Sequence, residues 1–208
     1  MATLRVNDLS LEIAYRDFEH GWVHYDIWLR WRGEPIINDA ILKREGDYWA
    51  KRGKGAIKAC EHYHCGVLPL LRRVLETNES RYWEPLEPDI LLAVYPKAHF
   101  PFLSPEWEFI DEPSEAKAAR EARIKERLAR KPSPDDLIDV MSFVDAYNFE
   151  GASSYQGSGL CFRLMPTRAC LEQFYQDLRA EYLVFRERHR VDAHNRGEMG
   201  PNYKEPWF

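Results

Sequence analysis

Long apolar runs, a signal peptide and any abundance of cysteine are missing from this 208-residue sequence. No apolar stretch approaches the roughly 18 residues that a membrane-spanning helix requires, which argues against a membrane partner. The first residues, MATLRVNDLSLEI, carry polar side chains at every second or third position, so we expect no signal peptide and a cytoplasmic protein. The four cysteines could form two disulfides, but without a secretion signal we expect reduced thiols.

Recognised catalytic signatures are missing as well. The sequence contains no G-x-S-x-G, P-loop, H-E-x-x-H or paired C-x-x-C pattern. The stretch SYQGSGL places Ser158 between two glycines, but a strand and not a helix is expected to follow it. Such a stretch is typical of a turn, because phosphate and oxyanion cradles need the N-terminus of a helix. These absences favour a protein without catalytic residues and without a cofactor.

The composition is that of an acidic globular protein. The net charge is -5 and the hydrophobic share is 45%, which is enough for a sizeable core. Because phosphate binding depends on Lys and Arg, the acidic balance argues against a dedicated nucleic-acid binder.

Strict alternation is the clearest pattern in the first third of the chain. The stretch WVHYDIWLRWR, residues 22–32, predicts a half-buried antiparallel strand. The preceding LEIAYRD alternates in the same way, and a hairpin through FEHG is expected to join the two strands. We assign one face to the core: Val23, Tyr25, Ile27, Leu29 and Trp31. The opposite face then holds Trp22, His24, Asp26, Trp28, Arg30 and Arg32.

After Lys51 the hydrophobic period changes to three and four residues. From Ile57 to Leu75 this spacing predicts one stripe of a helix. Pro69 would kink that helix or lie in the first turn of a new one, after a break near Gly66.

The rest of the chain predicts strands and two helices. DILLAVYP and EWEFID are expected to be strands, and so are LIDVMSFVDAYNFEG and GSGLCFRLMP. Residues 113–131 form a charged helical insertion with a thin apolar stripe, Thr167 caps a closing amphipathic helix, and residues 191–208 are an irregular tail. We therefore predict a single α+β domain over residues 1–208, with an antiparallel sheet packed against a few helices and a solvated helical insertion.

The stretch CEHYHC, from Cys60 to Cys65, concentrates the residue types that bind zinc. On a helix Cys60 and His64 would share one face, with Cys65 beside them. A zinc site built from local pairs needs a second pair elsewhere, and the chain offers none with recognisable spacing. We therefore predict that the stretch packs into the core, and keep these three residues as candidate metal ligands.

The polar face of the residue 22–32 strand is the least ordinary feature. Trp22 and Trp28 alternate there with His24, Arg30 and Arg32, and binding surfaces are enriched in aromatic residues and arginine. Two interpretations stay open: these five residues form a binding surface, or a helix or the insertion covers them as a second buried layer.

Two stretches resemble known proteins. SYQGSGLCFRLMPTRACLEQFYQDLRAEYLVF, with Gly157, Gly159, Leu160, Phe162, Leu164, Leu171, Phe174 and Leu178, resembles the closing segment of the WapI-type immunity proteins of bacteria. The stretch VHYDIWLRWRGEPIINDAIL is similar to the strand that such proteins place before their first helix. The resemblance implies a non-catalytic protein that neutralises a cognate toxin by binding it.

We therefore expect an immunity-type protein whose partner is a protein, and its acidic charge would suit a basic toxin. One alternative is a metal-dependent enzyme centred on Cys60 and His64. A second is a defence-associated module that binds nucleic acid through Trp22, Trp28, Arg30 and Arg32 by stacking.

Overall fold

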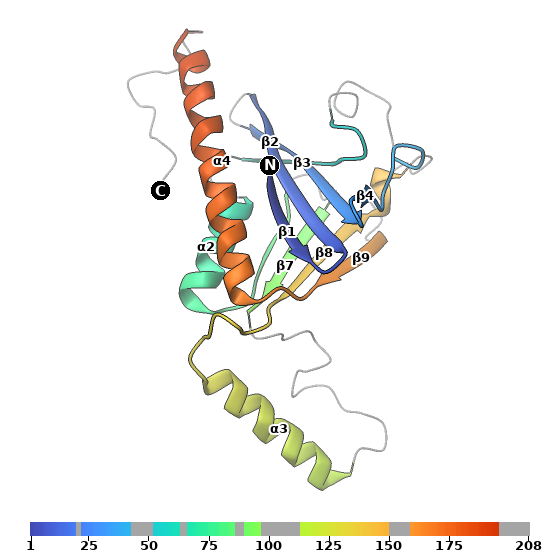
Figure 1. The fold of residues 1–208 in the computed structure, drawn as a ribbon, viewed down its shortest axis with the longest axis vertical. Helices are drawn as coiled ribbons and strands as arrows, with labels where there is room; N and C mark the ends of the chain where they lie inside the picture. The colour runs from blue at the N-terminus through green and yellow to red at the C-terminus, as the bar shows by residue number, and fades with distance from the viewer. Residues whose placement is uncertain are drawn as a thin grey trace.

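A computed structural model describes residues 1–19, 22–42, 52–62, 66–85, 90–96, 113–149 and 159–195. The predicted α+β class is confirmed, with two antiparallel sheets and helices packed beside them (Figure 1). No helix among these residues combines the length and the apolar character needed to cross a membrane.

The first sheet is built around β3. Strands β1 (Ala2–Val6), β2 (Leu9–Glu19) and β3 (Trp22–Trp31) pair in sequence order. The other edge of β3 pairs with both β4 (Glu34–Pro35) and β5 (Ile57–His62). Glu19 lies opposite Trp22, as expected for the hairpin predicted between β2 and β3. The register shifts between Tyr15 and Asp17, as in a β-bulge.

The second sheet has the order β6-β7-β8-β9. Its strands are β6 (Arg81–Trp83), β7 (Ile90–Tyr95), β8 (Asp139–Asp145) and β9 (Gly159–Leu164), and the short 3-10 helix η2 (Ala146–Asn148) follows β8. At the start of β9 the backbone comes so close to β8 that a Cβ on Gly159 would lie 1.9 Å from the carbonyl oxygen of Val144. Only glycine fits at that position without a shift of the backbone.

Two helices complete the core beside the sheets. Helix α2 (Val67–Thr77) begins directly after Gly66. Pro69 therefore lies in the first turn of a new helix, which was one of the two arrangements predicted for it. Helix α4 (Arg168–Asn195) begins after Thr167, whose hydroxyl accepts a hydrogen bond from the N–H of Cys170 at 3.3 Å. The predicted apolar stripe of α4 is buried in the common core: Leu171, Phe174, Leu178, Tyr182 and Phe185.

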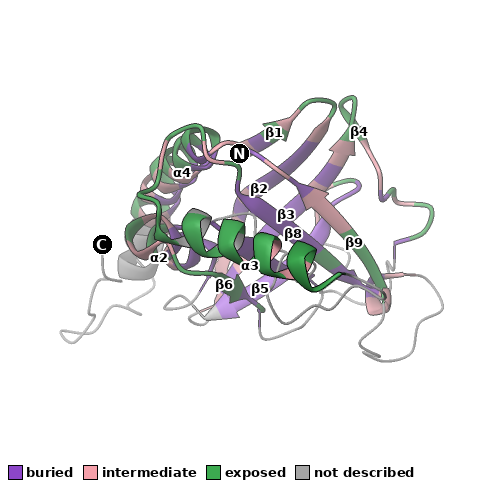
Figure 2. Ribbon diagram, turned by 90° about the horizontal axis from the view of Figure 1, so that it is seen from below, coloured by how far each residue is buried: buried purple, intermediate pink, exposed green. Residues whose placement is uncertain are grey.

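The predicted insertion forms helix α3 (Ser114–Ala129), which extends away from the sheets in Figure 1. Most of its described side chains are exposed, as the green ribbon in Figure 2 shows. A charged helix of this kind buries little apolar surface, so packing contributes little to its stability.

Two sequence predictions differ from the structure, and others fall outside the described residues. The helix predicted from Ile57 is wrong over Ile57–His62, because this segment forms β5 and its backbone pairs with β3. Helix α4 extends to Asn195, into the segment predicted to be an irregular tail. The predicted strand EWEFID lies outside the described residues, as do residues 196–208.

Candidate binding surface

The polar face of β3 lies mostly at the boundary between core and solvent. Trp22, His24, Trp28 and Arg30 are half-buried, whereas Asp26 between them is buried. The opposite face is core as predicted, because Val23, Tyr25, Ile27 and Leu29 are all buried. Both faces of β3 are therefore largely shielded from water, one as part of the apolar core and the other as a half-buried polar surface.

An ion pair holds the end of this face that lies nearest the β3–β4 turn. Arg30 donates from Nε to Glu12 Oε2 at 2.6 Å, and Glu12 is only 5% exposed. The Arg30 guanidinium also lies 5.7 Å from the centre of the Trp28 ring. Cation–π contact and charge pairing thus position Arg30 between a carboxylate and an indole.

Residues 52–56, which we call the covering segment, lie over the middle of the face. The indole N–H of Trp28 donates to the Lys54 carbonyl at 2.9 Å, and Asp26 accepts the N–H of Gly53 at 3.0 Å. A Cβ on Gly53 would lie 2.9 Å from the Trp28 ring, so this backbone passes directly against the indole. The insertion α3 does not cover this face, since the covering segment occupies it.

Asp26 lies among cations in a buried setting. Burial raises the pKa of its carboxyl group above the 3.8 of a solvated aspartate, while Arg16, the Gly53 N–H, Lys58 and Arg52 oppose that shift. Lys58 is opposite Asp26 on β5 and is 1% exposed. A buried Lys was not predicted from the sequence, because its position was assigned to a helix and not to a strand beside β3.

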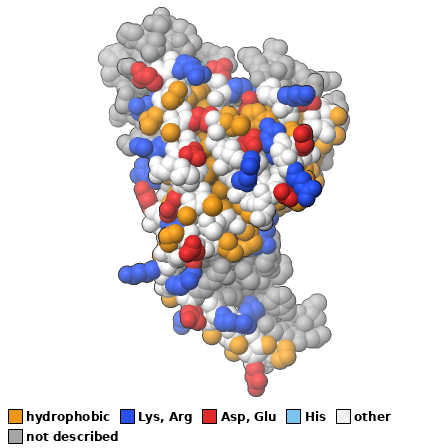
Figure 3. Space-filling view, in the orientation of Figure 1, with side chains coloured by type: hydrophobic (Ala, Val, Ile, Leu, Met, Phe, Trp, Pro, Cys, Tyr) orange, Lys and Arg blue, Asp and Glu red, His pale blue; other side chains and the backbone are white. Residues whose placement is uncertain are grey.

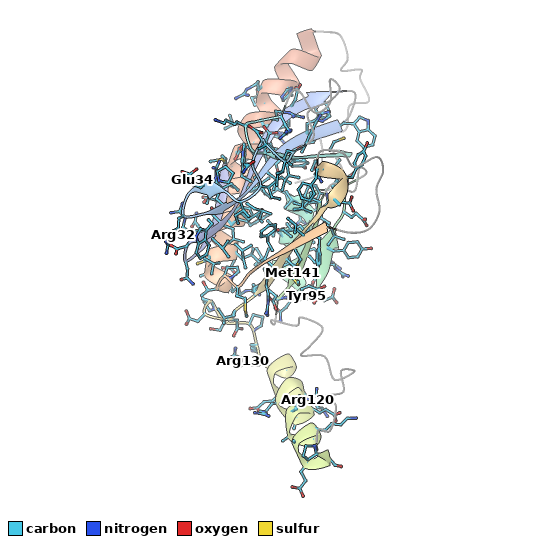
Figure 4. All side chains as sticks on the ribbon, turned by 90° about the vertical axis from the view of Figure 1, so that its right-hand side faces the viewer. Arg32, Glu34, Tyr95, Arg120, Arg130 and Met141 are labelled. Carbon is cyan, nitrogen blue, oxygen red and sulfur yellow. The ribbon has the colours of Figure 1, made fainter. Side chains whose placement is uncertain are left out.

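The exposed part of the surface is a corner at the β3–β4 turn, which we call the Trp31–Arg32 corner. Trp31 is 49% exposed, and the guanidinium of Arg32 lies over its ring at 5.5 Å from the ring centre. Arg32 also donates from Nε to Asp8 Oδ2 at 3.1 Å and from its backbone N–H to the Asp8 carbonyl at 2.7 Å. Arg32 and Glu34 lie at the outer edge of the body in Figure 4.

The sequence prediction was wrong about the side of Trp31 and about the end of the strand. Trp31 was assigned to the core face, but it is exposed, and Arg32 is not part of the strand. Arg32 and Gly33 have positive φ values of 52° and 88°, so the alternation of β3 stops at Trp31. The Arg-Gly pair directly after Trp31 was the signal that could have revealed the turn.

Of the three candidate metal ligands, only Cys60 is among the described residues. Cys60 is 7% exposed on β5, opposite His24. His64 and Cys65 lie outside the described residues. Among the side chains that the structure describes, there is no group of three or more His, Cys, Asp or Glu residues placed to hold a metal ion.

No family model, curated protein or solved structure matches this chain.

Proposed function

We propose that the chain is a non-catalytic binding protein of the immunity type, which neutralises a cognate protein toxin by covering part of its surface. The observation that carries this proposal is the Trp31–Arg32 corner. It presents a large, half-exposed aromatic ring and an arginine whose side chain is 70% exposed, and these are the residue types that dominate binding energy at interfaces.

The corner is held in place before any partner arrives. The backbone bond from Arg32 to Asp8 joins the β3–β4 turn to the β1–β2 turn, where Asn7 also has a positive φ of 53°. Left-handed backbone at non-glycine residues costs conformational energy, and it persists where the surroundings fix it. A fixed corner loses little conformational entropy on binding, which favours affinity.

Charge pairing favours a protein partner over nucleic acid. Arg30 is paired with Glu12, and Arg32 with Asp8, so each guanidinium already has a carboxylate beside it that would repel a phosphate. Figure 3 shows acidic and basic side chains mixed over the visible face of the body, without a continuous basic stripe. Such a surface suits recognition by complementary shape and local charge.

The test is protection in living cells. The chain is co-produced in a bacterial host with the polypeptide encoded beside its gene, and growth and complex formation are measured together. The proposal predicts that the neighbouring polypeptide alone arrests growth, that this chain restores growth, and that the two purify as one complex. Growth arrest without rescue or complex formation contradicts the proposal.

A further inference from the structure

The second sheet ends at β6, whose outer edge has no strand beside it among the described residues. Strand β6 (Arg81–Trp83) pairs with β7 along one side, and no strand among the described residues pairs with its other side. Unpaired N–H and C=O groups of an edge strand are ready to accept an added strand. The shortness of β6 limits non-specific pairing, so a bound segment would need further contacts beside the strand.

Those contacts are available in a groove between β6 and helix α2, which we call the edge groove. It has a volume of about 620 Å³, and its α2 wall includes Pro69, Arg73 and Glu76, which lie on one side of the helix by their spacing. The β6 wall includes Tyr82 and Trp83. This volume is within the range of about 300–1,000 Å³ that is usual for ligand pockets.

The β6 wall offers one exposed ring and one buried hydrogen-bond donor. Tyr82 is 69% exposed, so its ring is accessible to a bound segment. Trp83 is 5% exposed, and its indole N–H has no hydrogen-bond acceptor among the residues that the structure describes. Buried indole N–H groups normally have an acceptor, so this one is open to an acceptor from outside the described residues.

The charges along the groove leave two side chains unmatched. Arg72 pairs with Glu76 at 2.9 Å, and Arg81 pairs with Glu79. Among the residues that the structure describes, Arg73 and Glu84 have no ion-pair partner, and they lie on opposite walls of the groove. One wall therefore presents an uncompensated positive charge and the other an uncompensated negative charge.

We propose that the edge groove binds an extended peptide segment of a protein partner. The segment adds to the outer edge of β6 as a further strand, places an acidic side chain at Arg73 and a basic side chain at Glu84, and packs against Tyr82. This goes beyond the proposed function, because the edge groove is on the second sheet and the Trp31–Arg32 corner is on the first.

The experiment selects a phage-displayed library of random 12-residue peptides on the full chain, and then measures the enriched peptides by fluorescence anisotropy. The inference predicts enriched peptides with one acidic and one basic residue at a fixed spacing. Binding falls at least tenfold in Arg73→Glu and in Glu84→Lys, and a peptide with the two charges exchanged binds the double variant. The matched control Arg5→Glu, a reversal of an exposed arginine on β1, leaves binding unchanged.

Backbone methylation of the peptide separates strand addition from other modes of docking. Methyl groups on the peptide nitrogens that face β6 abolish binding, whereas methyl groups on the alternate nitrogens are tolerated. Three results would overturn the inference. The first is binding that tolerates a methyl group at every peptide nitrogen, and the second is equal enrichment of the peptides on the wild type and on Arg73→Glu. The third is loss of peptide binding in the control Arg5→Glu. Trp31→Ala keeps full peptide binding, so failure here and failure of the immunity role are distinguishable.

Discussion

The two faces of β3 are shielded from water by opposite kinds of chemistry. On one face Tyr25 and Ile27 pack into the apolar core, where Ile27 is 0% exposed. On the other face Asp26 and Arg30 are held by ion pairs and by the covering segment. Burial of apolar side chains stabilises the fold whatever their orientation toward one another, whereas a buried charge is tolerated only while its partner stays in place. The comparison predicts how each face responds to substitution.

The largest effect is expected on the apolar face. Ile27→Ala removes buried methyl groups and leaves a cavity, so the free energy of unfolding should fall by about 2–5 kcal/mol. Urea denaturation followed by tryptophan fluorescence measures this change. The conservative variant Ile27→Val should lose only about 0.5–1.5 kcal/mol. Equal losses in the two variants would show that this face is not closely packed.

A smaller effect is expected where the polar face depends on one ion pair. Arg30→Ala leaves the carboxylate of Glu12 buried without its guanidinium, which should cost about 1–2 kcal/mol, because Arg30 is partly solvated. Arg30→Lys keeps the positive charge and should recover part of the loss. Chemical denaturation of both variants at low and high salt checks this. An unchanged free energy of unfolding in Arg30→Ala would contradict the role given to the pair.

Asp26 gives the polar face a pH dependence. Because burial raises the pKa of Asp26, the folded chain holds this proton to a higher pH than the unfolded chain does. Between the ordinary pKa and the raised one, the folded state binds more protons, so this group makes the free energy of unfolding fall as pH rises. Asp26→Asn cannot ionise and can still accept the N–H of Gly53, so it should lack this decline.

The measurement is urea denaturation of the wild type and Asp26→Asn between about pH 3.5 and 7, the range in which a carboxyl group with a raised pKa titrates. As pH rises, the unfolding free energy of the wild type should fall relative to that of Asp26→Asn. A difference that stays constant over the range would mean that the pKa of Asp26 is the same in both states.

The sequence was informative wherever the periodicity of one segment decided its structure. The alternation of β3 correctly assigned Val23 and Ile27 to the core, and the spacing of Leu171, Phe174 and Leu178 did the same for α4. It failed over Ile57–His62, where spacing suited a helix but pairing with β3 prevailed. Backbone pairing with a distant strand leaves no mark in the local period, so neither β5 nor the burial of Lys58 could be predicted.

The candidate site was predicted in part. Sequence patterning singled out the polar face of β3, but the covering segment over Trp28 is a contact between parts of the chain far apart in sequence. Trp31 was missed because a period-two pattern does not show where a strand ends. The left-handed backbone of Arg32 and Gly33 follows directly, so Trp31 is the last residue of β3, where its indole is exposed.

The central claim is that the Trp31–Arg32 corner contacts the protein partner without supporting the fold. The most direct measurement is the affinity of Trp31→Ala for the toxin identified in the protection experiment, by calorimetry, beside its free energy of unfolding. We predict a loss of about 2 kcal/mol or more in binding, roughly thirtyfold in affinity, with a change in unfolding free energy within about 0.5 kcal/mol. A variant that binds as tightly as the wild type, or one whose lost binding is matched by lost stability, would contradict the claim.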